Sequence, residues 1–376
     1  MVYLDYSATT PTDKRVLESF DRTALEYIGN PNSLHSLGVK AKELMDAAVN
    51  QVANLLNVSK EEVIFTSGAS ESNNLAIMGV INKYVNRGKT IITTKLEHSS
   101  ILSGVNYLKQ KGYTIKYVKV NSDGKIDIDN LKELIDDDTV LVSICEVNSE
   151  IGIIQDVNKI GEVLREYPRV IFHVDGTQAV GKKQVNLENI DLYSFSGHKI
   201  YGLKGVGCLI KKNNIELEPI IHGGKSQTIY RAGTPPLPLI VSMAKALKLI
   251  LSDLDYNMEY VSKLNRKLKT GLQNISGVVI NSDDSCLNNI VNISIKGVKP
   301  ETLLHALEED EIYISTKTAC SSIDSISLGV YTLTNNEELA SSSIRVSLSH
   351  LTKENEIDYF LEKFKMNIDK IRSIGN

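Results

Sequence analysis

Short apolar runs alternate with helical patterns between about residues 60 and 211 of this 376-residue chain. The runs are rich in Val, Ile, Thr and aromatic residues, which favour strands: VIFTS, TIITT, TIKYVKV, TVLVSICEV, RVIFHVD, LYSFS and GVGCLI. Between the early runs, apolar residues recur at helical spacing in SNNLAIMGVINKYV, SILSGVNYLKQ, IDNLKELI and VNKIGEVLREY. Such alternation predicts an α/β fold, with a mostly parallel seven-stranded sheet covered by helices.

The pattern changes after a long apolar helix, which we predict near residues 238–255. From residue 256 onward it predicts a helix, strands that include IVNISIKG, IYIST and SSIRVSLS, and helices over ETLLHALEED and ENEIDYFLEKFKMNIDKIR. This mixture is typical of a smaller α+β unit. We therefore expect a large domain over residues 16–255 and a small domain formed by residues 1–15 and 256–376.

Charge and composition narrow the possible partners and compartments. A net charge of −4, with both signs interspersed, disfavours a nucleic-acid partner. No apolar run approaches the roughly 20 residues that span a bilayer, and the N-terminus lacks the organisation of a secretory signal. We therefore expect a cytoplasmic protein without a membrane association. Cys145, Cys208, Cys286 and Cys320 lie far apart with no CxxC pair, so we expect neither a disulfide framework nor a metal site.

A His-Lys pair comes just after the predicted strand LYSFS, in the stretch SGHKIYG. In an open α/β sheet, ligands bind beyond the carboxyl ends of the strands. Lys199 is either a solvated loop residue or a reactive amine. An amine that is partly desolvated and lies beside another cationic group, here His198, loses its proton more easily and can form a Schiff base with a carbonyl.

The ends of three other predicted strands carry complementary groups. After VIFTS, the residues Gly68, Ala69 and Ser70 open a helix, with Ser70 as the candidate cap, and a helix N-terminus binds phosphate well. His98 follows TIITT, and Asp175 ends RVIFHVD; each could also be an ordinary helix cap. An amine, an acid for a ring nitrogen, an imidazole to stack on a ring and a phosphate site together predict pyridoxal phosphate as the cofactor.

The C-terminal unit adds a thiol and a guanidinium. Cys320 lies in ISTKTACSSIDSIS, a run of small and hydroxylated residues that indicates a loop, where a mobile nucleophile would be placed. Cys145 and Cys208 are instead expected to be small buried apolar residues. Arg345 projects from the predicted strand SSIRVSLS and could hold a substrate carboxylate bidentately.

These residues belong to motifs that run in order along almost the whole chain: YLDYSATTPTDKRV, GNPNSLHSLG, FTSGASESNNLAI, LEHSSIL, VNSEIGIIQDV, FHVDGTQAVGK, SGHKIYGLKGVG, YRAGT, TACSS and SSIRVSLS. The set resembles the group I cysteine desulfurases of the class V aminotransferases. The resemblance implies a fold-type I homodimer, dependent on pyridoxal phosphate, that takes sulfur from L-cysteine and leaves L-alanine. It also implies a sulfur-acceptor protein as a partner, in iron–sulfur cluster assembly or thiolation.

The resemblance also implies roles for individual residues. Lys199 would carry the cofactor, Asp175 would pair with its ring nitrogen, and His98 would stack on the ring and assist proton transfers. Cys320 would receive the sulfur as a persulfide. The phosphate would be held by Ser70, Ser196, His198, the backbone of Ala69 and, from the other subunit, Thr234. The phenolic oxygen would meet Gln178 and Ser149, and the substrate carboxylate would meet Arg345 and Asn148.

Several positions depart from the family pattern. Ser149 stands where an asparagine is usual, Leu203 stands where a proline is usual, and the stretch 225–227 replaces a glycine-rich one. Two groups of alternatives therefore stay open. The first is a selenocysteine lyase or an aminotransferase of the same fold. The second is a weakly active protein that binds pyridoxal phosphate and mainly recruits a partner.

Overall fold

The larger part of the molecule is built on a seven-stranded sheet in the order β2-β8-β7-β6-β5-β3-β4. The computed structural model describes residues 1–316 and 326–375. The strands are β2 (Val63–Thr66), β3 (Thr90–Thr93), β4 (Thr114–Tyr117), β5 (Thr139–Cys145), β6 (Ile171–Asp175), β7 (Leu192–Ser196) and β8 (Gly207–Lys211). Only β8 runs antiparallel to its neighbours. The predicted mostly parallel sheet of seven strands is thereby confirmed.

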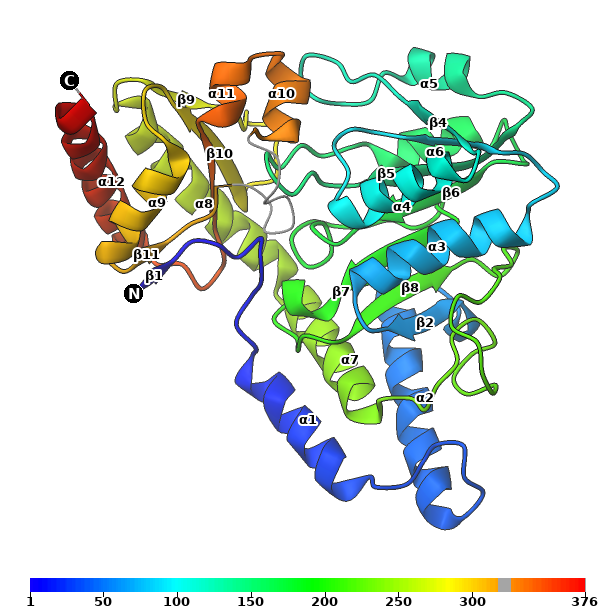
Figure 1. The fold of residues 1–376 in the computed structure, drawn as a ribbon. Coiled ribbons are helices and arrows are strands. Elements are labelled where there is room, and N and C mark those ends of the chain that lie inside the picture. The colour runs from blue at the N-terminus through cyan, green and yellow to red at the C-terminus, as the bar shows by residue number, and fades with distance from the viewer. Residues whose placement is uncertain (317–325, 376) are drawn as a thin grey trace.

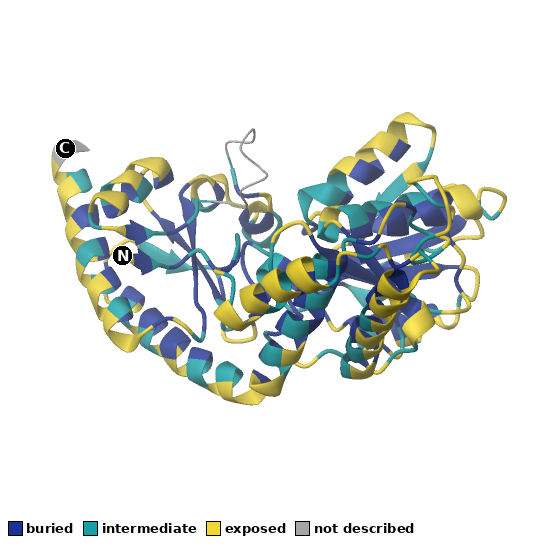
Figure 2. Cartoon of the chain, turned by 90° about the horizontal axis from the view of Figure 1, so that it is seen from below, coloured by how far each residue is buried: buried dark blue, intermediate teal, exposed yellow. Residues whose placement is uncertain are grey.

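Helices cover both faces of this sheet (Figure 1). They are α1 (Lys14–Glu26), α2 (Ser36–Leu56), α3 (Ala69–Lys83), α4 (Ser99–Gln110), α5 (Ile128–Leu134), α6 (Val157–Leu164) and α7 (Leu237–Ser252). Successive strand residues point to opposite faces. Ile64 and Leu209 pack with α3 and α4, whereas Phe65 and Cys208 pack with α2, α6 and α7. Because both faces are buried, the strands read as continuous apolar runs (Figure 2).

The smaller unit is built around a three-stranded antiparallel sheet, β12-β10-β9. Its strands are β9 (Val278–Ile280), β10 (Ile290–Ile295) and β12 (Ser343–Ser347), and its helices are α8 (Leu254–Gln273), α9 (Pro300–Glu309), α10 (Leu328–Thr334), α11 (Glu337–Ser341) and α12 (Glu354–Gly375). Apolar residues of β10, β12, α8, α9 and α12 form one core. Burial of each large aliphatic side chain stabilises such a core by about 1.5–3 kcal/mol.

The N-terminus belongs to this smaller core. Strand β1 (Val2–Tyr3) pairs in parallel with β11 (Ile312–Tyr313), and both Val2 and Leu4 pack in the core of the smaller unit. From there the chain crosses to α1 of the larger unit (Figure 1). These contacts support our proposal that residues 1–15 and 256–376 form a small domain beside a large domain of residues 16–255.

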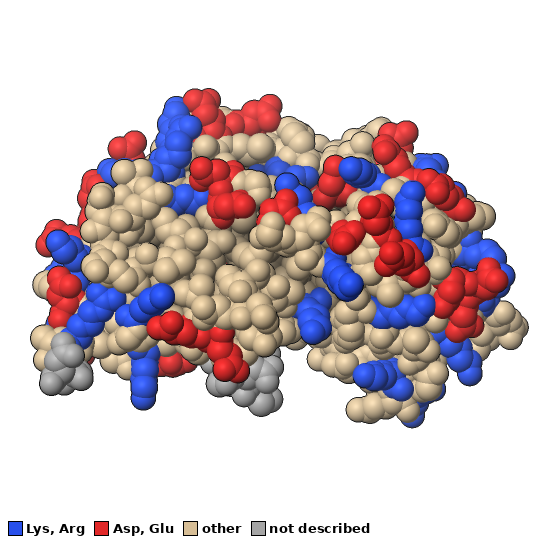
Figure 3. Space-filling model, turned by 90° about the horizontal axis from the view of Figure 1, so that it is seen from above, with Lys and Arg blue, Asp and Glu red and all other residues tan. Residues whose placement is uncertain are grey.

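Charged residues of both signs are intermingled on the face that Figure 3 shows. This agrees with the small net charge of −4. None of the helices in the part of the chain that the structure describes is long and apolar enough to cross a membrane.

A close backbone approach lies just beyond β6. Gly176 donates its N–H to the carbonyl of Ser194 at 2.9 Å, and the ring of Tyr193 lies against its Cα. A Cβ at Gly176 would stand 1.9 Å from Cζ of Tyr193. The buried Tyr193 hydroxyl donates to Glu146 at 2.6 Å, so the ring cannot move aside without breaking that bond.

We therefore expect Gly176→Ala to lower the free energy of unfolding by about 1–3 kcal/mol, because the added methyl group overpacks a buried site. Urea unfolding curves measure the change. Gly224→Ala is the matched control, because a Cβ there meets no atom within 4 Å. Equal midpoints for the two variants would contradict this account of Gly176.

Candidate active site

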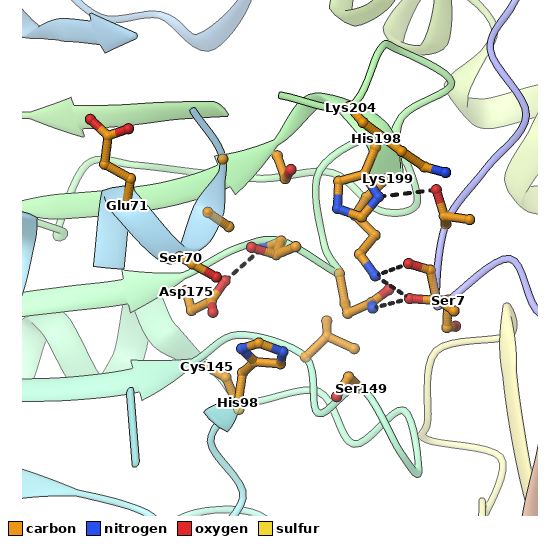
Figure 4. Close-up of a pocket in the computed structure, with 18 of the residues that line it drawn as sticks. Ser7, Ser70, Glu71, His98, Cys145, Ser149, Asp175, His198, Lys199 and Lys204 are labelled. Carbon is orange, nitrogen blue, oxygen red and sulfur yellow. Dashed lines mark hydrogen bonds between the residues drawn. The ribbon is translucent and has the colours of Figure 1, made fainter. Parts of the chain in front are cut away.

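A cavity of about 480 Å³ opens at the carboxyl ends of the parallel strands (Figure 4). The start of α3 and the ends of β5, β6 and β7 form its walls in the larger unit. N-terminal residues 7–9 and Arg345 of β12 close it from the other side. The predicted position of the site, beyond the strand ends, is therefore where the chain forms a cavity.

Lys199 ends a short 3₁₀ turn, Gly197–Lys199, that follows β7 without a break. Its ammonium donates to the carbonyl of Ser7 at 2.5 Å and to the carbonyl of Ala8 at 2.7 Å. The neighbouring carbonyl of His198 accepts the N–H of Thr10 at 3.0 Å. The N-terminal segment thus holds the lysine turn across the cavity, and Lys199 is not a solvated loop residue.

Asp175 and His98 face the same space (Figure 4). The Asp175 carboxylate accepts hydrogen bonds from the Asn73 amide and the Thr177 N–H, both at 2.9 Å. His98 caps α4, where its Nδ1 accepts the N–H of Ser100 at 3.2 Å. Burial lowers the pKa of His98; the charge of Asp175 opposes this shift and that of Lys199 adds to it. A buried acid and an imidazole with a lowered pKa therefore line the same cavity.

The start of α3 forms another wall. The prediction that Ser70 caps this helix is wrong: the cap is Gly68, whose carbonyl accepts the Ser72 N–H at 3.1 Å. The cap lies two residues earlier than predicted, at a point where the chain passes close to Gly207: a Cβ there would lie 2.5 Å from the Cα of Gly68. Ala69 and Ser70 therefore lie in the first turn, on the cavity wall, where the N–H groups of a helix face outward.

Ser196 and His198 line the cavity together with this helix start. Burial, followed by the nearby charges of Lys199, Lys204 and Lys182, lowers the pKa of His198 to about 4. His198 is thus neutral at physiological pH, and the positive charge at this end comes from lysines and the helix dipole. Such a site favours an anion.

Arg345 is 2% exposed and reaches the cavity from β12. It donates to the Ser149 carbonyl and to the Asp5 carboxylate, each at 2.8 Å, while its buried Nε has no partner among the described residues. Ser149 itself lines the cavity. The guanidinium is thus fixed on two sides by two of its five N–H groups, and further N–H groups remain for a ligand.

Three of the residues predicted for the site are not among the described residues that line the cavity. The Asn148 amide donates to the Leu96 carbonyl at 2.9 Å and accepts two backbone N–H groups, and Asn148 is not part of the cavity wall. Thr234 is exposed and also lies outside this wall. Cys320 lies outside the described residues.

Several residues of the site were not found from the sequence. Ser7 and Ala8 offer backbone carbonyls, which leave no signal in a side-chain pattern. Lys182 donates to Gln178, and its position four residues after Gln178 was the available signal. Cys145 lines the cavity but stays a protonated thiol, because burial raises its pKa well above the usual value, as do the charges of Glu97 and Asp175.

Glu97 is a buried acid directly behind this wall. It is 7% exposed, its Oε1 accepts the Thr94 hydroxyl at 2.7 Å, and its Oε2 has no partner among the described residues. Burial raises the pKa of Glu97 to about 8, and the charge of Asp175 contributes to the rise.

The cavity therefore defines a class of protein: an α/β fold whose sheet edge presents an amine, an acid, an imidazole and an anion-binding helix start to one ligand. Among the described residues, no group of His, Cys, Asp or Glu is arranged to hold a metal ion. The class points to an organic cofactor that bears an anionic group.

Comparisons with known proteins agree with this fold and this class of site. The model of the family "Aminotransferase class-V" matches residues 2–360. The protein "Cysteine desulfurase IscS" of Mannheimia succiniciproducens is 42% identical over 383 residues, covering 100% of this chain and 94% of that protein. A solved "NIFS-LIKE PROTEIN" is 36% identical with a TM-score of 0.93, covering 98% of this chain and 99% of the other. A structure described as "SspA in complex with cysteine" is 30% identical with a TM-score of 0.83, covering 94% and 100%. The chain belongs to the class V aminotransferases and, within them, to the cysteine desulfurases.

The raised pKa of Glu97 makes stability depend on pH. An unfolded Glu loses its proton near pH 4.5, whereas the folded protein keeps it up to about pH 8. Between these values, proton release favours unfolding, so stability falls as pH rises. Glu97→Gln removes this loss, and we expect its free energy of unfolding, relative to wild type, to be higher at pH 8 than at pH 5 by about 2–4 kcal/mol.

Urea unfolding of both proteins at the two pH values measures this difference. Glu162→Gln, on the exposed face of α6, is the control and should show the same difference from wild type at both pH values. A Glu97→Gln effect that did not change with pH would show that Glu97 is ionised in the folded protein.

Proposed function

We propose that the cavity binds pyridoxal 5′-phosphate, with Lys199 as the residue that carries it. The observation that supports this proposal most is the meeting of Lys199, Asp175, His98 and the start of α3 at one cavity. The residues fit the group chemically: an amine for its aldehyde, a carboxylate for its ring nitrogen and an anion site for its phosphate. The buried hydroxyl of Thr177, also on the wall, has no partner among the described residues and offers a further hydrogen bond.

Further contacts follow from the wall residues. The phosphate is assigned to Ser70, Ser196, His198 and the backbone of Ala69, and the phenolic oxygen to Gln178, with Ser149 beside it. The neutral ring of His98 can stack on the cofactor and accept or return a proton. When bound, the cofactor supplies an electron sink for charge that develops on the substrate's α-carbon.

The reaction proposed for this site is the conversion of L-cysteine to L-alanine. Arg345, already held by Ser149 and Asp5, binds the substrate carboxylate through its remaining donor capacity. Lys199 removes the α-proton. The thiolate of Cys320 then attacks the substrate's sulfur, so that a sulfur–sulfur bond forms, the carbon–sulfur bond breaks, and its electron pair stays with the carbon fragment. Protonation of that fragment gives alanine, and Cys320 keeps the sulfur as a persulfide.

We further propose that the protein acts as a homodimer and passes its sulfur to an acceptor protein, in iron–sulfur cluster assembly or thiolation. Leu25, Ile28 and Leu34 are 79%, 77% and 97% exposed where α1 ends and α2 begins, which offers an apolar surface to a second copy. A second copy would also bring Thr234 to the phosphate. A cytoplasmic location stays a prediction from the sequence.

The test is parallel quantification of alanine and sulfide from purified protein, L-cysteine and a reductant. We expect equal amounts of both products from wild type. Cys320→Ser should keep the visible absorbance of the bound cofactor and lose sulfide release by at least about a hundredfold, because the sulfur has no acceptor.

Cys286→Ser is the matched control, since it removes a buried thiol that does not line the cavity and should release sulfide normally. Normal sulfide release from Cys320→Ser would refute the role of Cys320. Bound cofactor without sulfide from wild type would favour an aminotransferase or a partner-recruiting protein instead.

A further inference from the structure

We propose that Lys182 is a positioning residue, which fixes the side-chain amide of Gln178 so that its N–H groups face the cofactor. The proposal deepens the proposed function and rests on the binding of pyridoxal phosphate there. Gln178 lines the cavity and is 5% exposed, whereas Lys182 approaches it from outside the wall.

The contacts of Gln178 specify one orientation of its amide. Lys182 Nζ donates to Oε1 of Gln178 at 2.6 Å, and Nε2 of Gln178 donates to the Ser7 carbonyl at 3.0 Å. An ammonium can only donate and a carbonyl can only accept. If the amide were flipped, two donors would meet at one end and two acceptors at the other. The bond from Lys182 becomes charge-assisted, and is then the stronger of the two constraints, when Lys182 is protonated.

This orientation leaves the second N–H of Gln178 for an acceptor in the cavity. A glutamine that presented its oxygen would repel a phenolate, whereas one that presents N–H stabilises it. The same network extends to the catalytic amine, because the Ser7 carbonyl also accepts from Lys199 at 2.5 Å (Figure 4). Lys182 is thus coupled through Gln178 to the place where the phenolic oxygen is expected.

Lys182 also belongs to a group of like charges. Burial, followed by the charges of Lys199 and Arg345, lowers the pKa of Lys182 well below the usual value. An anionic cofactor offsets these cations and so favours the charged form of Lys182. With the cofactor bound, the Lys182 cation in turn disfavours a positive charge on the Lys199 nitrogen that would carry the cofactor. The titratable and charged groups that line the cavity are Glu71, His98, Cys145, Asp175, His198, Lys199, Lys204 and Arg345, with Lys182 beside them.

The test follows the protonation of the Lys199–cofactor bond through the pH dependence of visible absorbance in protein loaded with pyridoxal phosphate. Lys182→Met removes both the donor and the charge. We expect Lys182→Met to raise the proton affinity of the Lys199 nitrogen that carries the cofactor about tenfold. Lys182→Arg keeps the donor and the charge and should restore the wild-type titration. If Lys182→Met does not fold, Lys182→Gln replaces it in the same comparison.

Lys211→Met is the matched control. Lys211 is also a buried lysine whose pKa is lowered by burial, but its ammonium bonds the carbonyls of Lys212 and Ile215, away from the cavity. Its loss should change stability and leave the titration in place. A purely structural role of Lys182 would give the same result as this control.

Gln178→Leu tests whether Lys182 acts through Gln178. If it does, Lys182→Met adds little to the titration shift when Gln178 is already Leu, because the effects of coupled residues are not additive. An unchanged titration in Lys182→Met, or the full shift in the Gln178→Leu background, would overturn the proposal. Absence of a cofactor band from wild type would instead overturn the proposed cofactor, and the role of Lys182 with it.

Discussion

The parallel pairing of β3, β5, β6 and β7 is the constraint on which the rest of the structure depends. Parallel strands end at the same edge of a sheet, so the residues that follow them meet although they lie far apart in the sequence. His98 follows β3, Asp175 ends β6, and Lys199 follows β7 within one 3₁₀ turn. A register shift of one residue in β6 would turn Asp175 to the other face of the sheet, away from the cavity.

The second requirement is the crossing of the N-terminal segment from the smaller core to the larger one. Residues 2–4 pack with the smaller unit, and Ser7 and Ala8 then present their carbonyls to Lys199. Arg345 reaches the same cavity from β12, where the pairing with β10 fixes its position. The cavity is therefore lined by residues of both cores, and in the proposed function the substrate carboxylate is bound from the smaller core.

Much of this arrangement could be predicted from the sequence. Seven apolar runs rich in β-branched residues match the seven strands, because strands buried on both faces must be apolar throughout. Lys199, Asp175 and His98 were found because each ends such a run or lies within four residues after it. Side chains at strand ends are thus the part of a site that a linear pattern reveals.

The remaining features depend on contacts that the pattern does not encode. The cap of α3 is Gly68, not Ser70, and Gly68 lies in close contact with Gly207, which is far away in the sequence. Asn148 turns its amide toward backbone groups of its own loop and of Leu96. The backbone carbonyls of Ser7 and Ala8 cannot be predicted from the types of side chain along the sequence. The role inferred for Lys182 depends on its hydrogen bond to Gln178, which only the structure shows.

We propose that Lys199 carries the cofactor, although Lys182 and Lys204 lie at or beside the same cavity. The most direct measurement is reduction of the loaded protein with borohydride, which makes a lysine–cofactor bond permanent, followed by peptide mapping by mass spectrometry. We expect the label on Lys199 alone. A label on Lys182 or Lys204, with Lys199 unmodified, would contradict it.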